Sequence, residues 1–589
     1  MFHLCSKFSS GRVLIDTLSN YILSLDKFDR VIVVEAPTGY GKSVGAPIVG
    51  ALNYTKNFSY NFIHVLPLRA IVEDLYLCKY LAAVTSCKSS KCKALPPNVF
   101  IEALKTMDID EDGIAYQMGL DHMIRGAGVK EPTYDAKVMI STLDSFAYTF
   151  LRIPVTEMFR EVKHYAIPRA RIFTSTVFLD EVHMLKRFDD ESSERALAFL
   201  KILLEFSIKT STPVVLATAT LWSRFRKTLA TWCEGKIMFF TLSNREEKNG
   251  LTVYVRDREF EDAAKSIKWV TNIVEEKDLV AKINEHSKCS ERVLVVRDTI
   301  RLAVDTYNKI DVDSNEKVLI HSRLCLKDRE DAVNRARTAK VVVATPVIEA
   351  GVDWDFDVGF RDATNTPSAI QVFGRVCRSR RDCEASVYLV KVKNSLRELV
   401  EYINMNRYID WRIPYSYTRN GVEFKGYSEI LEKSATITID VDENAERIFR
   451  ALTAPLFLPS KYIGSVLEIT NYSILKEPLA QFYVYGYNKL ENSRNSDDII
   501  SGTFTYSLEL VRKQLQCIDY FVCVVDREGE LITSLRKNVL HTTINSVEYA
   551  KLYKECIKSS SESRGRPIFI GFVLKENCYR NGLGFVGDE

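Results

Sequence analysis

Short, almost wholly apolar runs recur through the first 400 residues, and this recurrence constrains the fold more than any other feature of the sequence. The runs do not alternate between apolar and polar residues, so both faces of each strand should be buried. Longer amphipathic stretches separate them. The pattern predicts parallel sheets covered by helices on both sides. In the first unit, we expect strands at residues 30–36, 61–66, 98–104, 137–142, 175–180 and 213–218, and a helix at 68–84.

The same pattern restarts near residue 291, with expected strands at 292–296, 317–321, 340–345 and 385–390. Two successive α/β units therefore precede a third region, which begins near residue 400 and is richer in tyrosine and polar residues. We expect domains at 1–245, 246–400 and 401–589, with the first boundary inside the charged stretch 243–283. Residues 490–501 and 559–566 are expected to be exposed loops.

Composition limits how such a chain could bind nucleic acid. Its 589 residues carry 80 Lys and Arg against 77 Asp and Glu, a net charge of +3. This balance excludes binding by bulk positive charge, so any nucleic-acid site must be local. No apolar run approaches the length of a membrane span, and the start lacks the layout of a secretion signal. The 13 cysteines never form a CxxC motif, so we expect free thiols in a reducing cytoplasm.

The first expected strand leads into the sequence APTGYGKS, which is suited to holding phosphates. Gly39 and Gly41 allow backbone N–H groups to approach an anion closely, and the next helix points its N-terminus at it. Lys42 would reach the β- and γ-phosphates, while the Ser43 hydroxyl would hold Mg²⁺. Thr38 and Tyr40 complete the expected cradle. The alternative is a chance Gly-Lys turn.

A carboxylate pair in the sequence FLDEVH ends another apolar strand, at the sheet edge where open α/β folds bind ligands. Hydrolysis of a phosphoanhydride needs one carboxylate to orient Mg²⁺ and another to deprotonate water. We assign these tasks to Asp180 and Glu181, and expect His183 to sense the γ-phosphate. A solvated strand end would be the alternative reading if the phosphate cradle were missing.

The second unit contains QVFGRVCR, whose arginines could act on the nucleotide from across a cleft. Charge that develops on the γ-phosphoryl group is stabilised by such guanidinium forks. We assign Arg378 as the arginine finger, place Arg375 beside it, and expect Gln371 close to the attacking water. The alternative is a solvated basic helix. If each lobe supplies half of the site, ATP would close the lobes and product release would open them.

Together with PLRA, STLDSF, ATAT and ATPVIEAGVDWDFD, these motifs occur in an order that resembles superfamily 2 DExH helicases over residues 30–395. More narrowly, the chain resembles the helicase of type I CRISPR interference systems, an antiviral defence. The resemblance implies two RecA-like lobes, ATP and Mg²⁺ as cofactors, and a C-terminal accessory domain. It also implies coupling through Thr218 and Thr220, and nucleotide contacts from Gly351 and Asp353.

The same resemblance implies partners. Arg69, Thr142 and Thr345 would contact a single DNA strand, along which family members move 3′→5′. Many members carry a His-Asp nuclease domain, but none of the eight histidines here is followed by Asp. We therefore expect a stand-alone, monomeric helicase subunit that works with a guide-RNA surveillance complex and a separate nuclease chain. No glutamine that could read adenine precedes residue 31, so base selectivity stays open.

Two other functions remain compatible with the sequence. One is a DNA-repair or RNA helicase of the DExH type that acts outside CRISPR. The other is a non-catalytic assembly subunit switched by ATP. Intact Lys42, Glu181 and Arg378 argue against the switch, because it would not need the catalytic base or the finger.

Overall fold

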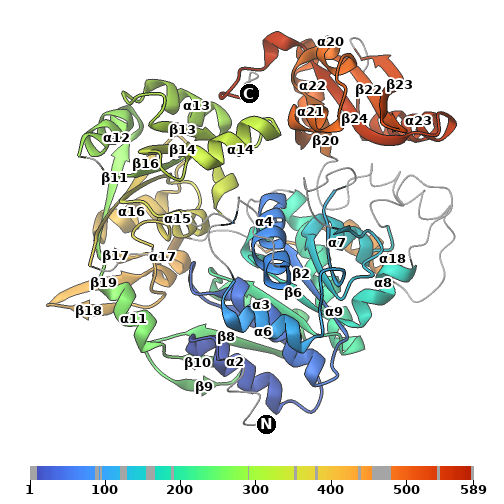
Figure 1. Cartoon of the computed structure of the whole chain (residues 1–589). Helices are drawn as coiled ribbons and strands as arrows, with labels where there is room; N and C mark the ends of the chain where they lie inside the picture. The colour runs from blue at the N-terminus through green and yellow to red at the C-terminus, as the bar shows by residue number, and fades with distance from the viewer. Residues whose placement is uncertain are drawn as a thin grey trace.

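The structure is a computed structural model of the chain. It describes residues 9–85, 92, 96–119, 129–153, 166–186, 191–289, 291–349, 354–378, 382–434, 439–453, 479–539 and 544–585. Figure 1 shows two α/β lobes and a smaller C-terminal domain that lies above the first lobe and beside the second. The expectation of two tandem parallel-sheet lobes of the RecA type is confirmed.

The first lobe contains a ten-stranded sheet in the order β4-β3-β5-β2-β6-β7-β1-β8-β10-β9. All neighbours pair in parallel except β9 and β10, which are antiparallel. The strands are β1 (Val31–Glu35), β2 (Asn61–Leu66), β3 (Ile114–Gln117), β4 (Val129–Lys130), β5 (Val138–Thr142), β6 (Ser175–Leu179), β7 (Val214–Thr218), β8 (Ile237–Leu242), β9 (Glu247–Asn249) and β10 (Thr252–Val255).

Helices cover both faces of this sheet, as apolar strands require. In β1, Val31 and Val33 pack into one apolar core, while Ile32 and Val34 pack into another on the opposite face. The second face is covered by α2 (Val13–Ser24), α3 (Lys42–Thr55), α4 (Arg69–Leu75), a π-helical turn (Tyr76–Leu81), α5 (Ala82–Val84) and α6 (Asn98–Thr106). The first face is covered by α7 (Leu143–Phe150), α8 (Ala166–Phe173), α9 (Glu191–Thr210) and α10 (Ser223–Trp232).

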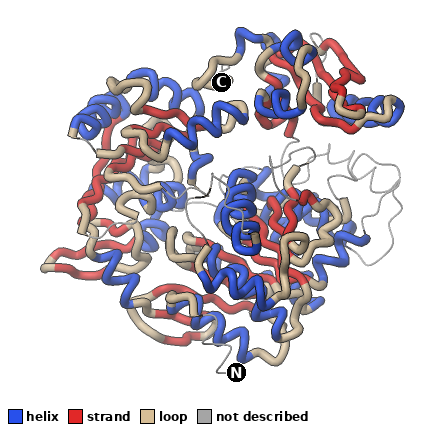
Figure 2. The backbone as a smooth tube through the Cα atoms, in the orientation of Figure 1, coloured by secondary structure: helices blue, strands red, loops and turns tan. Residues whose placement is uncertain are grey.

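The second lobe follows α11 (Arg258–Lys265) and contains a six-stranded sheet in the order β11-β16-β15-β12-β14-β13, paired in parallel throughout. In Figure 2, this lobe lies to the left of the first, and its strands form a separate group. The strands are β11 (Lys268–Glu275), β12 (Val293–Val296), β13 (Lys317–Ile320), β14 (Val341–Ala344), β15 (Val358–Asp362) and β16 (Glu384–Lys391). Its helices are α12 (Leu279–Lys288), α13 (Ile300–Lys309), α14 (Leu326–Arg335), α15 (Thr366–Phe373) and α16 (Arg397–Met405).

The chain next forms a small connecting unit, consisting of β17 (Ile409–Asp410), β18 (Tyr417–Arg419), β19 (Val422–Gly426), α17 (Tyr427–Ser434) and α18 (Glu443–Thr453). It is fastened to the second lobe by Trp411, whose Nε1 donates to Thr271 Oγ1 at 3.0 Å. It is fastened to the first lobe by α18, where Glu446 accepts a hydrogen bond from Lys201 on α9 at 2.9 Å. This unit therefore bridges the two lobes.

A separate domain follows, with a five-stranded mixed sheet in the order β21-β20-β24-β22-β23 and its own apolar core. Its tail lies on the second lobe, where His321 Nε2 is 2.9 Å from the carbonyl oxygen of Leu583. The elements are β20 (Leu479–Tyr483), α20 (Gly486–Glu491), α21 (Ser496–Ser501), β21 (Thr503–Ser507), α22 (Glu509–Lys513), β22 (Ile518–Arg527), β23 (Glu530–Asn538), α23 (Ser546–Glu562) and β24 (Arg566–Leu574).

The domain boundaries shift from those expected. The first sheet continues past residue 245, because β10 pairs with β8, so the lobes divide between Val255 and Lys268. Residues 401–589 do not form one accessory domain either, because hydrogen bonds and ion pairs attach the connecting unit to both lobes. The connecting unit has a three-stranded sheet in the order β17-β19-β18, and the part from residue 479 onward has a separate five-stranded sheet.

Several local expectations were also wrong. Residues 98–104 form helix α6, because Phe100, Ala103 and Leu104 share the buried face of a helix and could not share one face of a strand. The expected loop at 490–501 contains α21, and the first half of the one at 559–566 is the end of α23. The expected free thiols are contradicted for eight cysteines, which form the disulfides Cys78–Cys92, Cys377–Cys383, Cys517–Cys578 and Cys523–Cys556.

Among the described helices, none is both long and apolar enough to cross a lipid bilayer.

Candidate functional site

The phosphate loop lies between β1 and α3, as its sequence predicts. Gly39 and Gly41 have φ values of +82° and +109°, which L side chains rarely adopt, so the loop needs glycine at both positions. Lys42 begins α3 and is buried; its Nζ donates to the carbonyl oxygen of Ala36 at 3.0 Å. The backbone thus holds the ammonium group inside the loop, close to where an anion would lie.

The two carboxylates follow β6 and face this loop. Ser43 Oγ donates to Asp180 Oδ2 at 2.8 Å, which joins the two proposed magnesium ligands directly. Glu181 has φ +54°, a strained value for a residue that is not glycine, and its N–H donates to Asp180 Oδ1 at 3.0 Å. This turn directs Glu181 Oε1 towards Lys42 Nζ, at 4.0 Å.

The acids differ in their affinity for a proton. Burial raises the pKa of Glu181, with the charge of Asp180 adding to the effect and Lys42, Arg375 and Arg378 opposing it. Burial also raises the pKa of Asp180, but the nearby His64 ring, Lys42 and the hydrogen bond from Ser43 outweigh it and leave that pKa lowered. Asp180 is therefore the better permanent anion and Glu181 the better proton acceptor.

The second lobe reaches into the site through α15. Thr38 Oγ1 donates to Gln371 Oε1 at 2.7 Å, and Gln371 Nε2 lies 3.5 Å from His183 Nε2. On its other side, His183 Nδ1 lies 3.2 Å from Thr218 Oγ1 and 3.4 Å from Glu181 Oε2. These contacts connect the phosphate loop, the carboxylates and the second lobe through one buried imidazole.

The expected coupling pair lies at the end of β7, next to this imidazole. Thr220 N–H donates to Thr218 Oγ1 at 3.1 Å, and the same hydroxyl donates to the carbonyl oxygen of Thr220 at 3.1 Å. The turn therefore holds Thr218 in place for its contact with His183.

The two arginines of the second lobe occupy different environments. A Cβ atom at Gly39 would lie 3.5 Å from Arg378 Nε, so this side chain rests against the phosphate loop. Arg375 is 2% exposed, and its Nη2 donates to the carbonyl oxygen of Glu349 at 2.6 Å, inside its own lobe. Arg378 thus contacts the loop of the other lobe, while Arg375 hydrogen-bonds within its own lobe and its charge also acts on Glu181.

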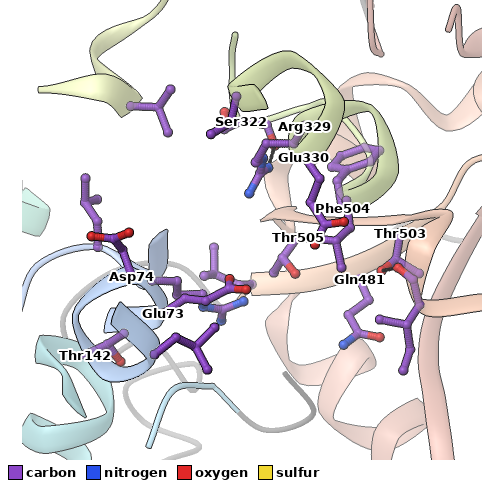
Figure 3. A pocket seen from close by; sticks show the side chains of 18 of the residues that line it. Glu73, Asp74, Thr142, Ser322, Arg329, Glu330, Gln481, Thr503, Phe504 and Thr505 are labelled. Atoms are coloured by element: carbon purple, nitrogen blue, oxygen red, sulfur yellow. Dashed lines mark hydrogen bonds between the residues drawn. The ribbon is translucent and has the colours of Figure 1, made fainter. Parts of the chain in front are cut away.

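A cavity of about 380 Å³ lies between the first lobe, α14 of the second lobe and the C-terminal sheet (Figure 3). Arg69 and Thr142, two of the expected nucleic-acid contacts, are among its lining residues. The third, Thr345, is buried at the end of β14 and is not part of the lining. Sequence reasoning did not select several further polar lining residues: Ser322, Arg329, Arg337, Gln481 and Thr505.

Gly351 and Asp353 lie outside the described residues, so their expected contacts with the nucleotide stay predictions.

Sequence reasoning missed one buried neighbour of the carboxylate pair. His64 is fully buried in β2, with its Nε2 3.7 Å from Asp180 Oδ2 and its Nδ1 2.9 Å from Tyr80 Oη. The signal was present, because a histidine in the otherwise apolar run FIHVL needs polar partners.

Comparison with known proteins agrees with this architecture. A family model described as "CRISPR-associated nuclease/helicase Cas3, C-terminal" matches residues 289–381. The chain is 23% identical to the CRISPR-associated nuclease/helicase Cas3 of Methanothermobacter thermautotrophicus, over 76% of this chain and 54% of the relative. It is 22% identical to the CRISPR-associated helicase Cas3 of Thermoproteus tenax, over 62% of this chain and 56% of the relative.

Among solved structures, T. fusca Cas3 with AMPPNP has the same fold, with a TM-score of 0.57 and 15% identity over 86% of this chain and 65% of that chain. Fold and motifs are similar to those of helicase superfamily 2. Within that superfamily, the chain is similar to Cas3 helicases over the parts that match. It spans about half the length of the curated relatives named above.

Proposed function

We propose that the protein is an ATP-dependent DNA helicase or translocase that moves 3′→5′ on target DNA in CRISPR interference. One observation carries the proposal: Lys42, Ser43, Asp180 and Glu181 of the first lobe and Arg378 of the second converge on one phosphate loop. Names of the curated relatives support the helicase and CRISPR assignments.

In this proposal, the loop N–H groups and Lys42 bind the β- and γ-phosphates of ATP. Glu181 takes the proton from the attacking water, for which its raised pKa is favourable, and Arg378 stabilises charge that develops on the γ-phosphoryl oxygens. Gln371 orients the water, while His183 passes the state of the γ-phosphate to Thr218.

The residues suit Mg²⁺, which prefers oxygen ligands and usually keeps only one or two from protein. Ser43 and Asp180 provide such a pair, already joined by a hydrogen bond. Within the described residues, no group of three or more His, Cys, Asp or Glu side chains could hold a metal on its own. When bound with ATP, Mg²⁺ would neutralise charge on the β- and γ-phosphates.

Single-stranded DNA would occupy the cavity that Arg69 and Thr142 line. Contacts of this kind to phosphate and sugar position a strand without reading its sequence, as a motor requires. The lobes would close on ATP and open on product release, so that each cycle moves the strand.

We further propose that a guide-RNA surveillance complex presents the DNA in the cytoplasm, and that a nuclease outside these 589 residues cuts it. The lack of any His-Asp pair in the sequence supports the second point, as does the name of the T. tenax relative, which mentions a helicase alone. Pull-down with a guide-RNA complex bound to target DNA tests the first point.

The central test is DNA-stimulated ATP hydrolysis by the purified chain. Lys42→Ala and Glu181→Gln should abolish it, whereas Lys209→Ala, on the exposed end of α9, should leave it unchanged. Stronger stimulation by RNA than by DNA would contradict the DNA assignment. Absence of turnover in the wild type would instead favour an ATP-switched assembly subunit.

Two further assays test direction and nuclease activity. Duplexes with a 3′ single-stranded tail should be unwound, and those with a 5′ tail should not. Single-stranded DNA incubated with Mg²⁺ or Mn²⁺ should remain intact. Cleavage that survives both Lys42→Ala and Glu181→Gln would place a nuclease within this chain and refute that part of the proposal.

A further inference from the structure

Two arginines that no motif includes lie beside the phosphate loop. Arg12 precedes α2, and its guanidinium carbon is 5.5 Å from the ring centre of Tyr40 and 5.9 Å from that of Phe260. Arg412 follows β17, and its guanidinium carbon is 5.7 Å from the same Phe260 ring. Two guanidinium groups from distant parts of the sequence therefore meet over one aromatic ring.

Both arginines lie near Arg378 and near the phosphate loop. A Cβ atom at Gly41 would lie 3.9 Å from Arg12 Cγ, and one at Gly39 would lie 3.5 Å from Arg378 Nε. Arg412 Nη1 is 3.4 Å from the carbonyl oxygen of Cys377, the residue before Arg378. Three arginines from three separate segments thus gather along the phosphate loop.

Hydrogen bonds around Asp257 fix the backbone that follows Arg12. Asp257 Oδ1 accepts the N–H of Phe260 and caps α11, while its Oδ2 accepts the Tyr40 hydroxyl at 2.7 Å and the Val13 N–H at 3.4 Å. The Tyr40 hydroxyl in turn accepts the N–H of Leu14 at 3.0 Å. The start of α2, the phosphate loop and α11 are therefore joined through one carboxylate.

Carboxylates compensate the charges in this cluster only in part. Within the described residues, the buried Arg412 Nε has no hydrogen-bond partner, and Arg412 Nη1 donates to a carbonyl oxygen and not to a carboxylate. Burial lowers the pKa of Arg412, and the positive charges of Arg378 and Arg12 lower it further, against Asp410 and Asp355. Like charges gathered in a partly buried place favour an anion between them.

We propose, on the basis of the ATP-dependent function above, that Arg12 and Arg412 bind the α-phosphate and sugar end of the nucleotide. Lys42 and Arg378 serve the β- and γ-phosphates, so Arg12, beside Gly41 and Tyr40, lies next along the loop. Guanidinium forks bind phosphate oxygens in pairs, and their planes stack on any base. The site therefore accepts nucleoside triphosphates with little selection between adenine and guanine.

Equilibrium titration of the full chain with fluorescent, non-hydrolysable ATP and GTP analogues tests this inference. We expect Arg12→Ala and Arg412→Ala each to raise the Kd about tenfold, or about 1.4 kcal/mol, with Arg412→Lys in between. Arg407→Ala, on the exposed segment before β17, is the matched control and should bind like the wild type. ATP and GTP analogues should differ less than about fivefold.

An unchanged Kd in both alanine variants would overturn the proposal, as would a preference of about a hundredfold for ATP over GTP. Thermal melting identifies a variant that fails to fold; Arg412→Gln, which keeps the length of the side chain, then replaces Arg412→Ala. If the wild type binds nucleotide but shows no DNA-stimulated hydrolysis, the proposed helicase function is refuted. The measured Kd values then still decide whether Arg12 and Arg412 bind the nucleotide.

Discussion

The two arginines of QVFGRVCR, Arg375 and Arg378, look equivalent in the sequence, but the structure predicts different roles for them. Arg378 rests against Gly39 of the other lobe, while Arg375 donates to the carbonyl oxygen of Glu349 within its own lobe. We therefore expect Arg378→Ala to impair catalysis and Arg375→Ala to impair stability. The comparison separates a residue that acts on the nucleotide from one that supports the lobe.

The expected sizes follow from these positions. Loss of an arginine finger lowers kcat by about 10³-fold or more, and removal of the half-buried Arg378 should change the melting temperature little. Loss of Arg375 removes a charged, buried hydrogen bond worth about 2 kcal/mol, which lowers the melting temperature by about 4–8 °C for a lobe of this size. Because Arg375 is buried, at 2% exposure, we expect the fall in melting temperature to lie near the upper end of this range.

Steady-state ATPase kinetics and thermal melting, measured on both variants and on Arg378→Lys, provide the assay. The lysine variant retains charge but not the bidentate fork, so it should recover only part of kcat. A fully active Arg378→Ala beside an inactive Arg375→Ala with wild-type melting would refute the reasoning and make Arg375 the finger.

Three other results are expected. Glu181→Gln should bind nucleotide without hydrolysing it. Because burial raises the pKa of Glu181 in the free protein, wild-type kcat/KM should fall with decreasing pH at a value above 4.5; an acid limb at or below 4.5 would contradict this. Thr38→Val removes the hydrogen bond to Gln371 and should lower kcat/KM about fivefold, whereas Thr38→Ser should retain it; equal rates for the two variants would show that the contact has no role. Burial lowers the pKa of His321 to about 4, so the neutral ring is favoured in the folded state. Stability should therefore fall as pH drops from about 6.5 to 4, and it should fall less steeply in His321→Gln. If the ring is protonated without loss of the Leu583 contact, the wild type and the variant should lose stability equally.

Much of the site could be predicted because its residues lie close together in sequence around strand ends. APTGYGKS and FLDEVH each follow a buried apolar strand, and the carboxyl ends of parallel strands meet at one edge of a sheet. The prediction failed where periodicity was misread. Phe100, Ala103 and Leu104 have helical spacing, but their run was short and apolar enough to be taken for a strand.

Residues that depend on long-range contacts could not be assigned in this way. Arg12 and Arg412 belong to no recognisable motif, and only the packing of both onto Phe260 brings them together. Thr142 ends strand β5 and Thr345 directly follows β14, yet only Thr142 lines the cavity. No local pattern distinguishes these two threonines, because the cavity wall is formed by three separate parts of the fold.

The amino-acid sequence alone therefore determined the α/β class, the phosphate loop, the carboxylate pair and the two lobes, since short-range periodicity and spacing encode each of them. Tertiary structure decided which arginine rests against the phosphate loop, how the connecting unit bridges the lobes, and where the C-terminal sheet lines the cavity. The physical reason is that these properties depend on contacts between segments hundreds of residues apart, and such contacts arise only when complete surfaces pack against one another.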